Sequence, residues 1–356
     1  MTKKSKVASL ATMIFVLAIV TAFGFFGYQL FRKPVSDDRT EIIFEVAPGV
    51  PFSQTAANLQ ENHLIRNAKA FQWYARLRGQ AGKVKVGEYS LNKAMTPDEI
   101  ISILVSGKSI ARSITVAEGL NIFDIAALFE KQGIGTRSEF LDAVHDKTFI
   151  KSLLGEDLTS LEGYLFPETY KYTKFEGTRA LITQMVKRFL IVWNEQLSTE
   201  LSKLRWSRHQ VVTLASIVEK ETGAANERPL VSSVFHNRLL KRMRLQTDPT
   251  VLYGMAVRDQ KVPTNITRDD LQNPTPYNTY VIESLPPGPI ANPGKESLFA
   301  VFNPANSKYL YFVSENNGTH RFSETLQQHN KAVQQFQLNA KARENKSWRD
   351  LKKSKK

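Results

Sequence analysis

The chain of 356 residues contains no cysteine, which excludes disulfide bonds and thiolate-bound metals. Its six histidines form no H-E-x-x-H pattern, so neither a metal-dependent enzyme nor any other cofactor is expected. The lack of cysteine is compatible with an oxidising compartment. The sequence has one uncharged segment that is long enough to cross a membrane, at residues 7–31.

Acidic residues are too few to balance the basic ones, and the formal net charge is +14. The excess lies near the two ends, with +3 from residues 3–6, +2 from residues 32–33 and +6 from residues 341–356. These segments leave +3 for residues 34–340, which is too little for a basic groove across a folded domain. Nucleic acid is therefore not an expected partner.

Residues 7–31 form a run of 25 without a charged side chain, where spanning a bilayer takes about 20. A short basic segment precedes the run, which predicts a cytoplasmic N-terminus and a chain that continues outside the membrane. A cleavable signal peptide is the alternative, but its apolar region would be only about 7–15 residues long. We therefore predict a cytoplasmic stub at 1–6, an uncleaved transmembrane helix at 7–31 and a linker at 32–40.

A weak internal repeat follows the linker. The sequence FEVAPG at residues 44–49 is echoed by ITVAEG at residues 114–119. Each copy predicts a β-branched strand, a glycine turn and an amphipathic helix. We expect a small α+β module at residues 41–155 that contains this repeat.

The most informative stretch is residues 207–223. Ser207 and Gln210 have the spacing of a capping box, and Gly223 is placed to end the helix in a left-handed conformation. The residues between are apolar on almost every side, which is typical of a buried helix. Glu219 lies in the last turn, where the helix dipole and apolar neighbours favour its protonated form. Such an acid suits general-acid catalysis, although Glu219 could also be a solvated residue at a helix end.

Two further regions bear on function. Residues 161–172 are rich in aromatic side chains, which indicate either a core or a sugar-binding cleft. From Leu245 onward the sequence is polar and rich in proline, which predicts rigid loops. Loops of this kind often carry functional residues. We expect a catalytic domain at residues 156–336 and a basic, disordered tail at residues 337–356.

The motifs EGYLFPETY, LASIVEKET, VFHNRL, LQTDPT, YNTY, LPPGPI and HRFSETLQQHN occur in this order between residues 161 and 330. In this order they resemble the endolytic murein transglycosylase family (MltG, also called YceG-like). One departure is Ser284, where the family pattern has glycine before LPPGPI. The resemblance implies an α+β chain with one N-terminal transmembrane helix, a LysM-like module and a mixed α/β catalytic domain.

The resemblance also implies a function. The enzyme would be a lyase, anchored in the plasma membrane with its catalytic domain outside the cytoplasm, that cuts nascent peptidoglycan strands internally. Its partners would be glycan strands and, as further candidates, peptidoglycan synthases. The glutamate of the VEKET stretch, here Glu219, would be the catalytic acid.

The residues expected around the sugar are all polar, and each could instead fix a turn: Gln246, Asp248, Tyr277, Asn278 and His320.

Two other functions remain open at this point. One is a lysozyme-type hydrolase with Asp248 as its second carboxylate. The other is a non-catalytic glycan-binding anchor in which Glu219 is inert.

Overall fold

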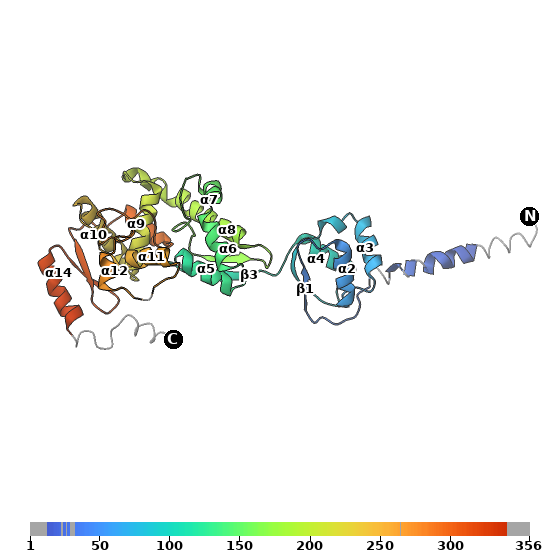
Figure 1. The fold of residues 1–356 in the computed structure, drawn as a ribbon. Helices are drawn as coiled ribbons and strands as arrows, with labels where there is room; N and C mark the ends of the chain where they lie inside the picture. Colours follow the sequence, from blue (N-terminus) through green and yellow to red (C-terminus); the bar gives the residue numbers. More distant parts are fainter. Residues whose placement is uncertain (1–12, 23, 26, 29–32, 264, 340–356) are drawn as a thin grey trace, which may run out of the picture. The chain divides into compact units, whose positions relative to one another are not determined.

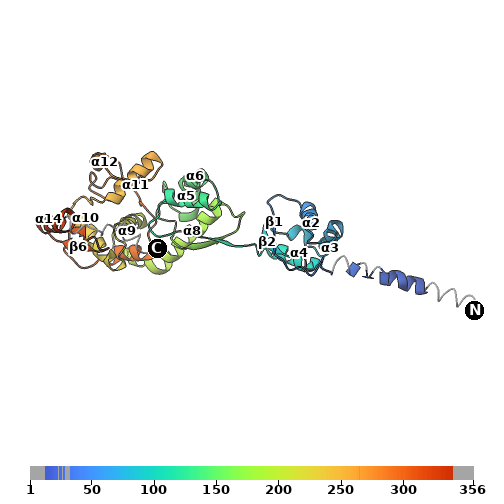
Figure 2. The ribbon, with the colours of Figure 1, turned by 90° about the horizontal axis from the view of Figure 1, so that it is seen from below.

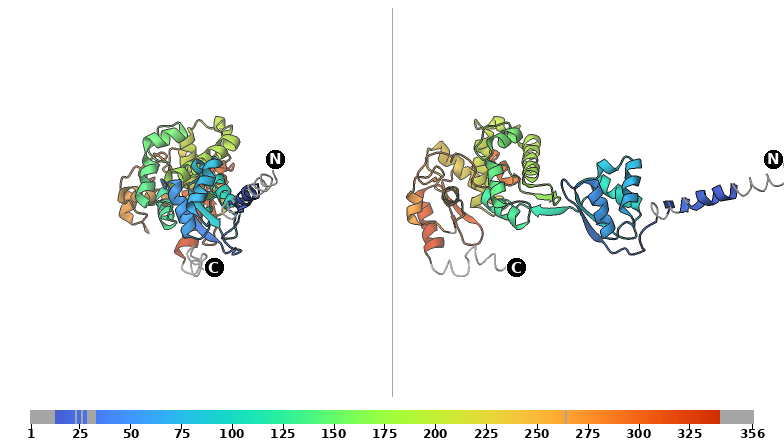
Figure 3. Two further views of the ribbon diagram at one scale, coloured as in Figure 1. Left: turned by 90° about the vertical axis from the view of Figure 1, so that its right-hand side faces the viewer. Right: turned by 45° about the vertical axis from the view of Figure 1, so that its right-hand side comes forward.

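The computed structural model of the chain describes residues 13–22, 24–25, 27–28, 33–263 and 265–339. The chain divides into two compact units. The first comprises residues 1–112 and 171–176, and the second comprises residues 113–170 and 177–356. Figure 1, Figure 2 and Figure 3 show the ribbon from several directions, coloured along the sequence.

The first unit is built around an antiparallel pair of strands in which Phe44 lies opposite Tyr89. Helices pack against this pair, and their apolar residues bury both of these rings (Figure 1). A capping box formed by Thr96 and Glu99 begins one of the helices. The elements are β1 (Ile42–Val46), α2 (Phe52–Glu61), α3 (Ala68–Leu77), the short 3₁₀ helix η1 (Ala81–Lys83), β2 (Gly87–Leu91) and α4 (Pro97–Ser106).

The rest of the described chain is mainly helical, with two further two-stranded sheets that pair β3 with β4 and β5 with β6. This mixture of helices and small sheets agrees with the predicted α+β class. The elements are β3 (Arg112–Thr115), α5 (Ile122–Lys131), α6 (Arg137–His145), α7 (Lys147–Leu154), β4 (Thr169–Tyr172), α8 (Thr178–Val192), η2 (Trp193–Leu197), η3 (Glu200–Lys203), α9 (Arg208–Glu221), η4 (Ala225–Glu227), α10 (Arg228–Leu240), α11 (Asp248–Asp259), α12 (Arg268–Gln272), α13 (Lys295–Phe302), β5 (Tyr311–Ser314), β6 (His320–Ser323), α14 (Leu326–Val333) and η5 (Gln334–Leu338).

The repeat seen in the sequence is also present in the order of the elements. Strand β1, a turn and helices α2 and α3 in the first copy correspond to β3, a turn and α5 and α6 in the second. In each copy the first strand pairs with a later strand, β2 or β4. The compact units separate the copies near residue 112, whereas the sequence placed both in one module that ends at residue 155. Residues 113–155 group with the second unit because the turn of the second copy forms backbone hydrogen bonds to Asn292.

Helix α9 is the central helix of the second unit and contacts α10, α11 and α13 (Figure 2). Its start is as predicted, because Ser207 and Gln210 form the capping box. Eight consecutive residues, 211–218, are buried. Its end also falls where Gly223 at the C′ position places it, because the last helical residue is Glu221 and the C-cap is Thr222. The predicted left-handed conformation is wrong: Gly223 has no positive φ, and Thr222 has an extended backbone with φ −134° and ψ 135°.

The region after Leu245 is less irregular than expected, since it contains the 12-residue helix α11. Pro249 lies at the start of this helix, where a proline is tolerated because the first N–H groups have no intrahelical acceptor. Val251, Tyr253 and Ala256 form its buried face. The prediction of a loop here was wrong because Pro249 was taken as a sign of a loop, whereas it marks the start of α11.

The predicted transmembrane segment at residues 7–31 and the basic tail at 337–356 lie partly outside the described residues, and the stub at 1–6 lies wholly outside them. Among the described residues, none of the helices combines the length and the apolar character needed to cross a membrane.

Candidate active site

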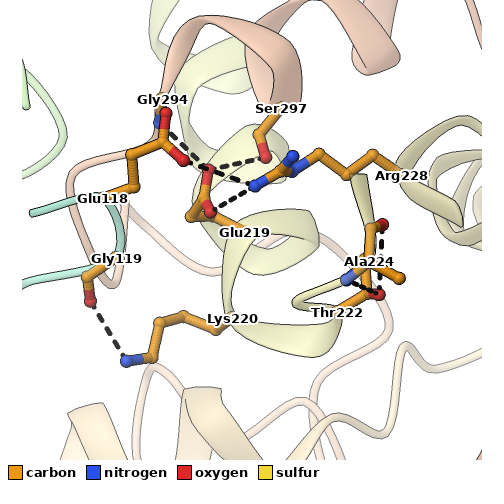
Figure 4. A network of polar contacts seen from close by, with 9 residues as sticks. All are labelled: Glu118, Gly119, Glu219, Lys220, Thr222, Ala224, Arg228, Gly294 and Ser297. Atoms are coloured by element: carbon orange, nitrogen blue, oxygen red, sulfur yellow. Dashed lines mark hydrogen bonds and ion pairs between the residues drawn. The ribbon is translucent and has the colours of Figure 1, made fainter. Parts of the chain in front are cut away.

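Glu219 lies in the last turn of α9, and its side chain is only 6% exposed. It is therefore not the solvated helix-end residue that the sequence left open. Its carboxylate points toward the start of α13 and the start of α10 (Figure 4). The N-terminus of α13 and the side chain of the first residue of α10 thus meet at one nearly buried acid.

Three groups donate hydrogen bonds to this carboxylate. The Gly294 backbone N–H donates to Oε2 at 3.0 Å, and the Ser297 hydroxyl donates to the same oxygen at 2.7 Å. Gly294 is the N-cap residue of α13, and Glu219 accepts its backbone N–H in place of the N3 side chain that does so in a capping box. The positive end of the helix dipole further stabilises a negative charge here.

The third donor is Arg228, the first residue of α10, whose side chain is 9% exposed. Its Nη2 lies 3.1 Å from Glu219 Oε1 and 3.4 Å from Oε2 of a second carboxylate, Glu118. One guanidinium nitrogen therefore joins two acids (Figure 4). Sequence reasoning predicted mainly apolar surroundings for Glu219 and missed this polar network.

Asp248 does not contact Glu219 in the described structure. It is the first residue of α11, it is exposed, and its Oδ1 accepts a hydrogen bond from the Tyr280 hydroxyl at 2.7 Å. Gln246 is also exposed, has a positive φ of 48° and donates its backbone N–H to Thr279. Both predicted sugar contacts are thus accessible to a ligand.

Tyr277 and Asn278 lie in the loop after α12 and differ in role. The ring of Tyr277 packs edge-on against Tyr253 at 4.9 Å between centroids, and burial raises the pKa of Tyr277 to about 12. Asn278 is fully buried, and its side-chain amide donates to the backbone carbonyls of Asp270 and Leu271 in α12 and of Asn273 just after that helix. Its carbonyl accepts from the Tyr280 backbone N–H. These bonds fit the alternative that Asn278 fixes a turn.

His320 begins β6 and is held by Glu227, the last residue of η4. The backbone N–H of His320 donates to Glu227 Oε1 at 2.8 Å, and its Nδ1 lies 2.7 Å from Oε2. The hydroxyl of Thr222, which follows α9, also donates to Oε2 of Glu227 at 3.3 Å. His320 is therefore linked through Glu227 to the chain that leaves α9.

Glu221 is the other acid on α9. The Thr247 hydroxyl donates to Glu221 Oε1, while burial, and secondarily the charge of Asp248, raises the pKa of Glu221 to about 7. An isolated Glu titrates near 4.5, so the folded chain retains this proton over a range where the unfolded chain has lost it. The free energy of unfolding should accordingly fall as the pH rises from about 4.5 to 7.

We expect Glu221→Gln to remove this dependence while keeping an oxygen that accepts from Thr247. Relative to wild type, the variant should gain stability, by up to about 3 kcal/mol, as the pH rises through that window. Thermal denaturation across a pH series measures the effect. Parallel curves for the two proteins would show that Glu221 titrates normally in the folded chain.

The residues that sequence reasoning missed are Glu118, Arg228, Gly294 and Ser297. Glu118 occupies the glycine turn of the second repeat, where the first copy has Pro48, and this difference was the one available signal. Arg228 precedes a proline at a helix start, a position that predicts a helix boundary but no site.

Comparison with known proteins agrees with the motifs. The YceG-like family matches residues 44–335. An endolytic murein transglycosylase of Bacillus subtilis (strain 168) is 35% identical over 325 residues, which are 87% of this chain and 89% of that protein. An endolytic murein transglycosylase of Streptococcus pneumoniae (strain D39) is 27% identical over 343 residues, which are 86% of this chain but 61% of that protein.

A solved structure adds a comparison at the level of the fold. The crystal structure of a YceG-like protein from Listeria monocytogenes shares 34% sequence identity and a TM-score of 0.57 with this chain. The alignment covers 82% of this chain and 98% of the other. On the extent of the family match and the identity to these relatives, the chain belongs to the YceG-like family, as its motifs predict.

Proposed function

We propose that the chain is an endolytic peptidoglycan lytic transglycosylase, a lyase that cuts glycan strands internally and leaves 1,6-anhydro-N-acetylmuramic acid ends. Membership of the YceG-like family and two relatives named endolytic murein transglycosylase support this proposal. The structural observation that carries it is Glu219, one nearly buried carboxyl group held by three donors.

The chemistry needs one carboxyl group. Glu219 gives its proton to the glycosidic oxygen between N-acetylmuramic acid and N-acetylglucosamine while the bond from that oxygen to C1 breaks. The Glu219 carboxylate then takes the proton of the muramic acid C6 hydroxyl, and O6 closes on C1. Glu219 is protonated again, and no water is consumed. Ordinary glycosidases, by contrast, use two carboxyl groups.

The surroundings of Glu219 suit this cycle. Negative charge develops on its carboxylate as the proton leaves, and the Gly294 N–H, the Ser297 hydroxyl and the Arg228 guanidinium are already aimed at it. Donors fixed in place before the reaction stabilise such a charge without rearranging. We propose that Gln246, Asp248, Tyr277 and His320 line the path of the sugar.

Mass spectrometry of peptidoglycan fragments tests the proposed function. Incubation with the protein should yield internal fragments that end in 1,6-anhydro-N-acetylmuramic acid. Reducing ends would instead indicate a hydrolase, and the absence of any cleavage would indicate a glycan-binding protein without catalytic activity.

The hydrolase alternative depends on Asp248 as a second carboxylate, and this residue can be tested separately. Because Asp248 pairs with Tyr280 and does not touch Glu219, we expect Asp248→Asn to raise KM while the products remain anhydro fragments. Steady-state kinetics with product analysis measures both effects. Loss of turnover with unchanged substrate binding would favour a two-carboxylate mechanism.

We further propose a location for the enzyme. Residues 7–31 would anchor the chain in the plasma membrane with its N-terminus in the cytoplasm, and the LysM-like module and catalytic domain would lie outside. The linker at residues 34–40 reaches at most about 25 Å when extended, which would hold the enzyme near the membrane face where new strands emerge from their synthases. The uncharged length of residues 7–31 and the basic residues before them support this proposal.

Removing the anchor tests the proposed location. A chain that starts at Arg39 should cut isolated glycan strands as the full chain does. Exported to the same compartment at equal abundance, it should fail to replace the full-length enzyme, because tethering raises the local concentration of enzyme at new strands. Full replacement in cells would show that tethering is incidental.

A further inference from the structure

The turn at residues 118–119 belongs to the second copy of the repeat, and its counterpart in the first copy is Pro48-Gly49. Gly49 and Gly119 have nearly the same positive φ, 76° and 77°, a conformation that favours glycine. The two copies thus share the geometry of the turn but not its chemistry. Only the second copy places an ionisable side chain, Glu118, before the glycine.

The backbone that carries Glu118 is fixed from two sides. Gly119 N–H donates to the Asn292 carbonyl at 2.9 Å, and Asn292 N–H donates to the Leu120 carbonyl at 2.9 Å. From α9, the Lys220 ammonium group donates to the Gly119 carbonyl at 3.1 Å (Figure 4). The turn is therefore tied both to the catalytic helix and to the loop that precedes α13.

The side chain of Glu118 completes a triad with Arg228 and Glu219. Its carboxylate lies over Gly294, where a Cβ atom would overlap it, and it approaches the same Arg228 nitrogen that Glu219 contacts. Glu118 is 47% exposed, whereas Glu219 is nearly buried. Partial burial, followed by the charge of Glu219, raises the pKa of Glu118.

Among the described residues, the ion-pair partners of Arg228 are Glu118 and Glu219, and the other charged groups nearby do not pair with it. Helix α9 contributes Lys220, which is engaged with a backbone carbonyl, and α13 contributes the exposed Lys295 and Glu296. The Glu296 charge adds to the negative potential at Glu118. Asp248 of α11 is paired with Tyr280. Two carboxylates consequently share one buried guanidinium.

We infer that Glu118 is a positioning residue for the cleavage reaction: it competes with Glu219 for the Arg228 guanidinium and so helps Glu219 to retain the proton that it must transfer. The inference rests on the proposed function of Glu219. An arginine paired with Glu219 alone would stabilise the carboxylate, which cannot act as an acid. A second carboxylate on the same nitrogen weakens that stabilisation, and its own negative charge further disfavours ionisation of Glu219.

The pH dependence of kcat/KM for glycan-strand cleavage tests this inference, with the full chain kept in detergent. In wild type, activity should fall at high pH as Glu219 loses its proton. In Glu118→Gln this basic limb should move to lower pH by about one unit, so that activity on the limb drops about tenfold while the acidic plateau changes little. Glu118→Asp keeps the charge and should restore the limb toward its wild-type position.

Glu296→Gln is the matched control, because it removes an equal charge from α13 without touching Arg228. Its basic limb should move less than that of Glu118→Gln, because the Glu296 charge reaches Glu118 without sharing Arg228. A uniform loss of activity in Glu118→Gln at every pH, or an unchanged profile, would overturn the inference and leave Glu118 a structural residue. Absence of cleavage by the wild-type chain would instead contradict the proposed function, so the two failures are distinguishable.

Discussion

Replacement of Glu219 by glutamine is expected to lower the rate of glycan-strand cleavage by a factor of about 10² to 10⁴, the usual contribution of a general acid. Glutamine has nearly the shape of glutamate but no proton that it can transfer to the glycosidic oxygen. Cleavage rates measured on purified strands test this expectation. Activity close to that of wild type would remove Glu219 as the acid.

The fold should survive the Glu219→Gln substitution. The glutamine carbonyl can still accept from the Gly294 N–H and the Ser297 hydroxyl, and Arg228 retains Glu118 as a partner. Circular dichroism and the melting temperature should therefore match wild type closely. Glu296→Gln again serves as the control, because it removes an exposed carboxylate of the same unit that forms no hydrogen bond with Glu219 or Arg228 in the described part of the chain.

Replacement of Arg228 by methionine is expected to have the largest effect on stability. The arginine side chain is nearly buried, and removing it leaves the Glu219 carboxylate in the interior without a counter-charge. Loss of one partner of a buried ion pair costs about 3 to 5 kcal/mol. Cleavage should also fall sharply, because one of the three groups that position the Glu219 carboxylate is lost.

The pH dependence identifies the cause of the Arg228→Met defect. Without the guanidinium, ionised carboxylates cost more in the folded chain than in the unfolded chain, so the folded chain binds protons more tightly. The stability deficit should therefore grow as the pH rises above about 4.5 and shrink below it.

Denaturant unfolding at several pH values measures this deficit. Arg258→Met, at an exposed ion pair with Asp259, should change stability little at any pH. A deficit in Arg228→Met that does not vary with pH would indicate lost packing alone.

Helix α9 was predictable because its signals are local. Ser207 and Gln210 lie three residues apart, and the buried run that follows them is continuous, so the start of α9 and the position of Glu219 near its end could be deduced from the chain. The backbone conformation at the helix end could not be deduced. Gly223 permits a left-handed helix end but does not require it, and the chain instead leaves α9 in an extended conformation at Thr222.

The surroundings of Glu219 depend on contacts between distant parts of the chain. Arg228 meets Glu118 across 110 residues, and Glu219 meets Ser297 across 78. No periodicity or turn signal reports such pairings. The sequence therefore indicated an acid at a helix end, while the guanidinium that joins it to a second carboxylate became visible only in the folded chain.

The source of oxygen in the new chain ends tests the central claim most directly. Glycan strands would be cleaved by the wild-type chain in water enriched in oxygen-18, and the masses of the fragments would be measured by mass spectrometry. The mechanism at Glu219 predicts anhydro ends that are lighter than reducing ends by one water and contain no oxygen-18, because the C6 hydroxyl of the substrate attacks C1. Reducing ends that carry one oxygen-18 atom would show that water attacks C1 and would contradict the account.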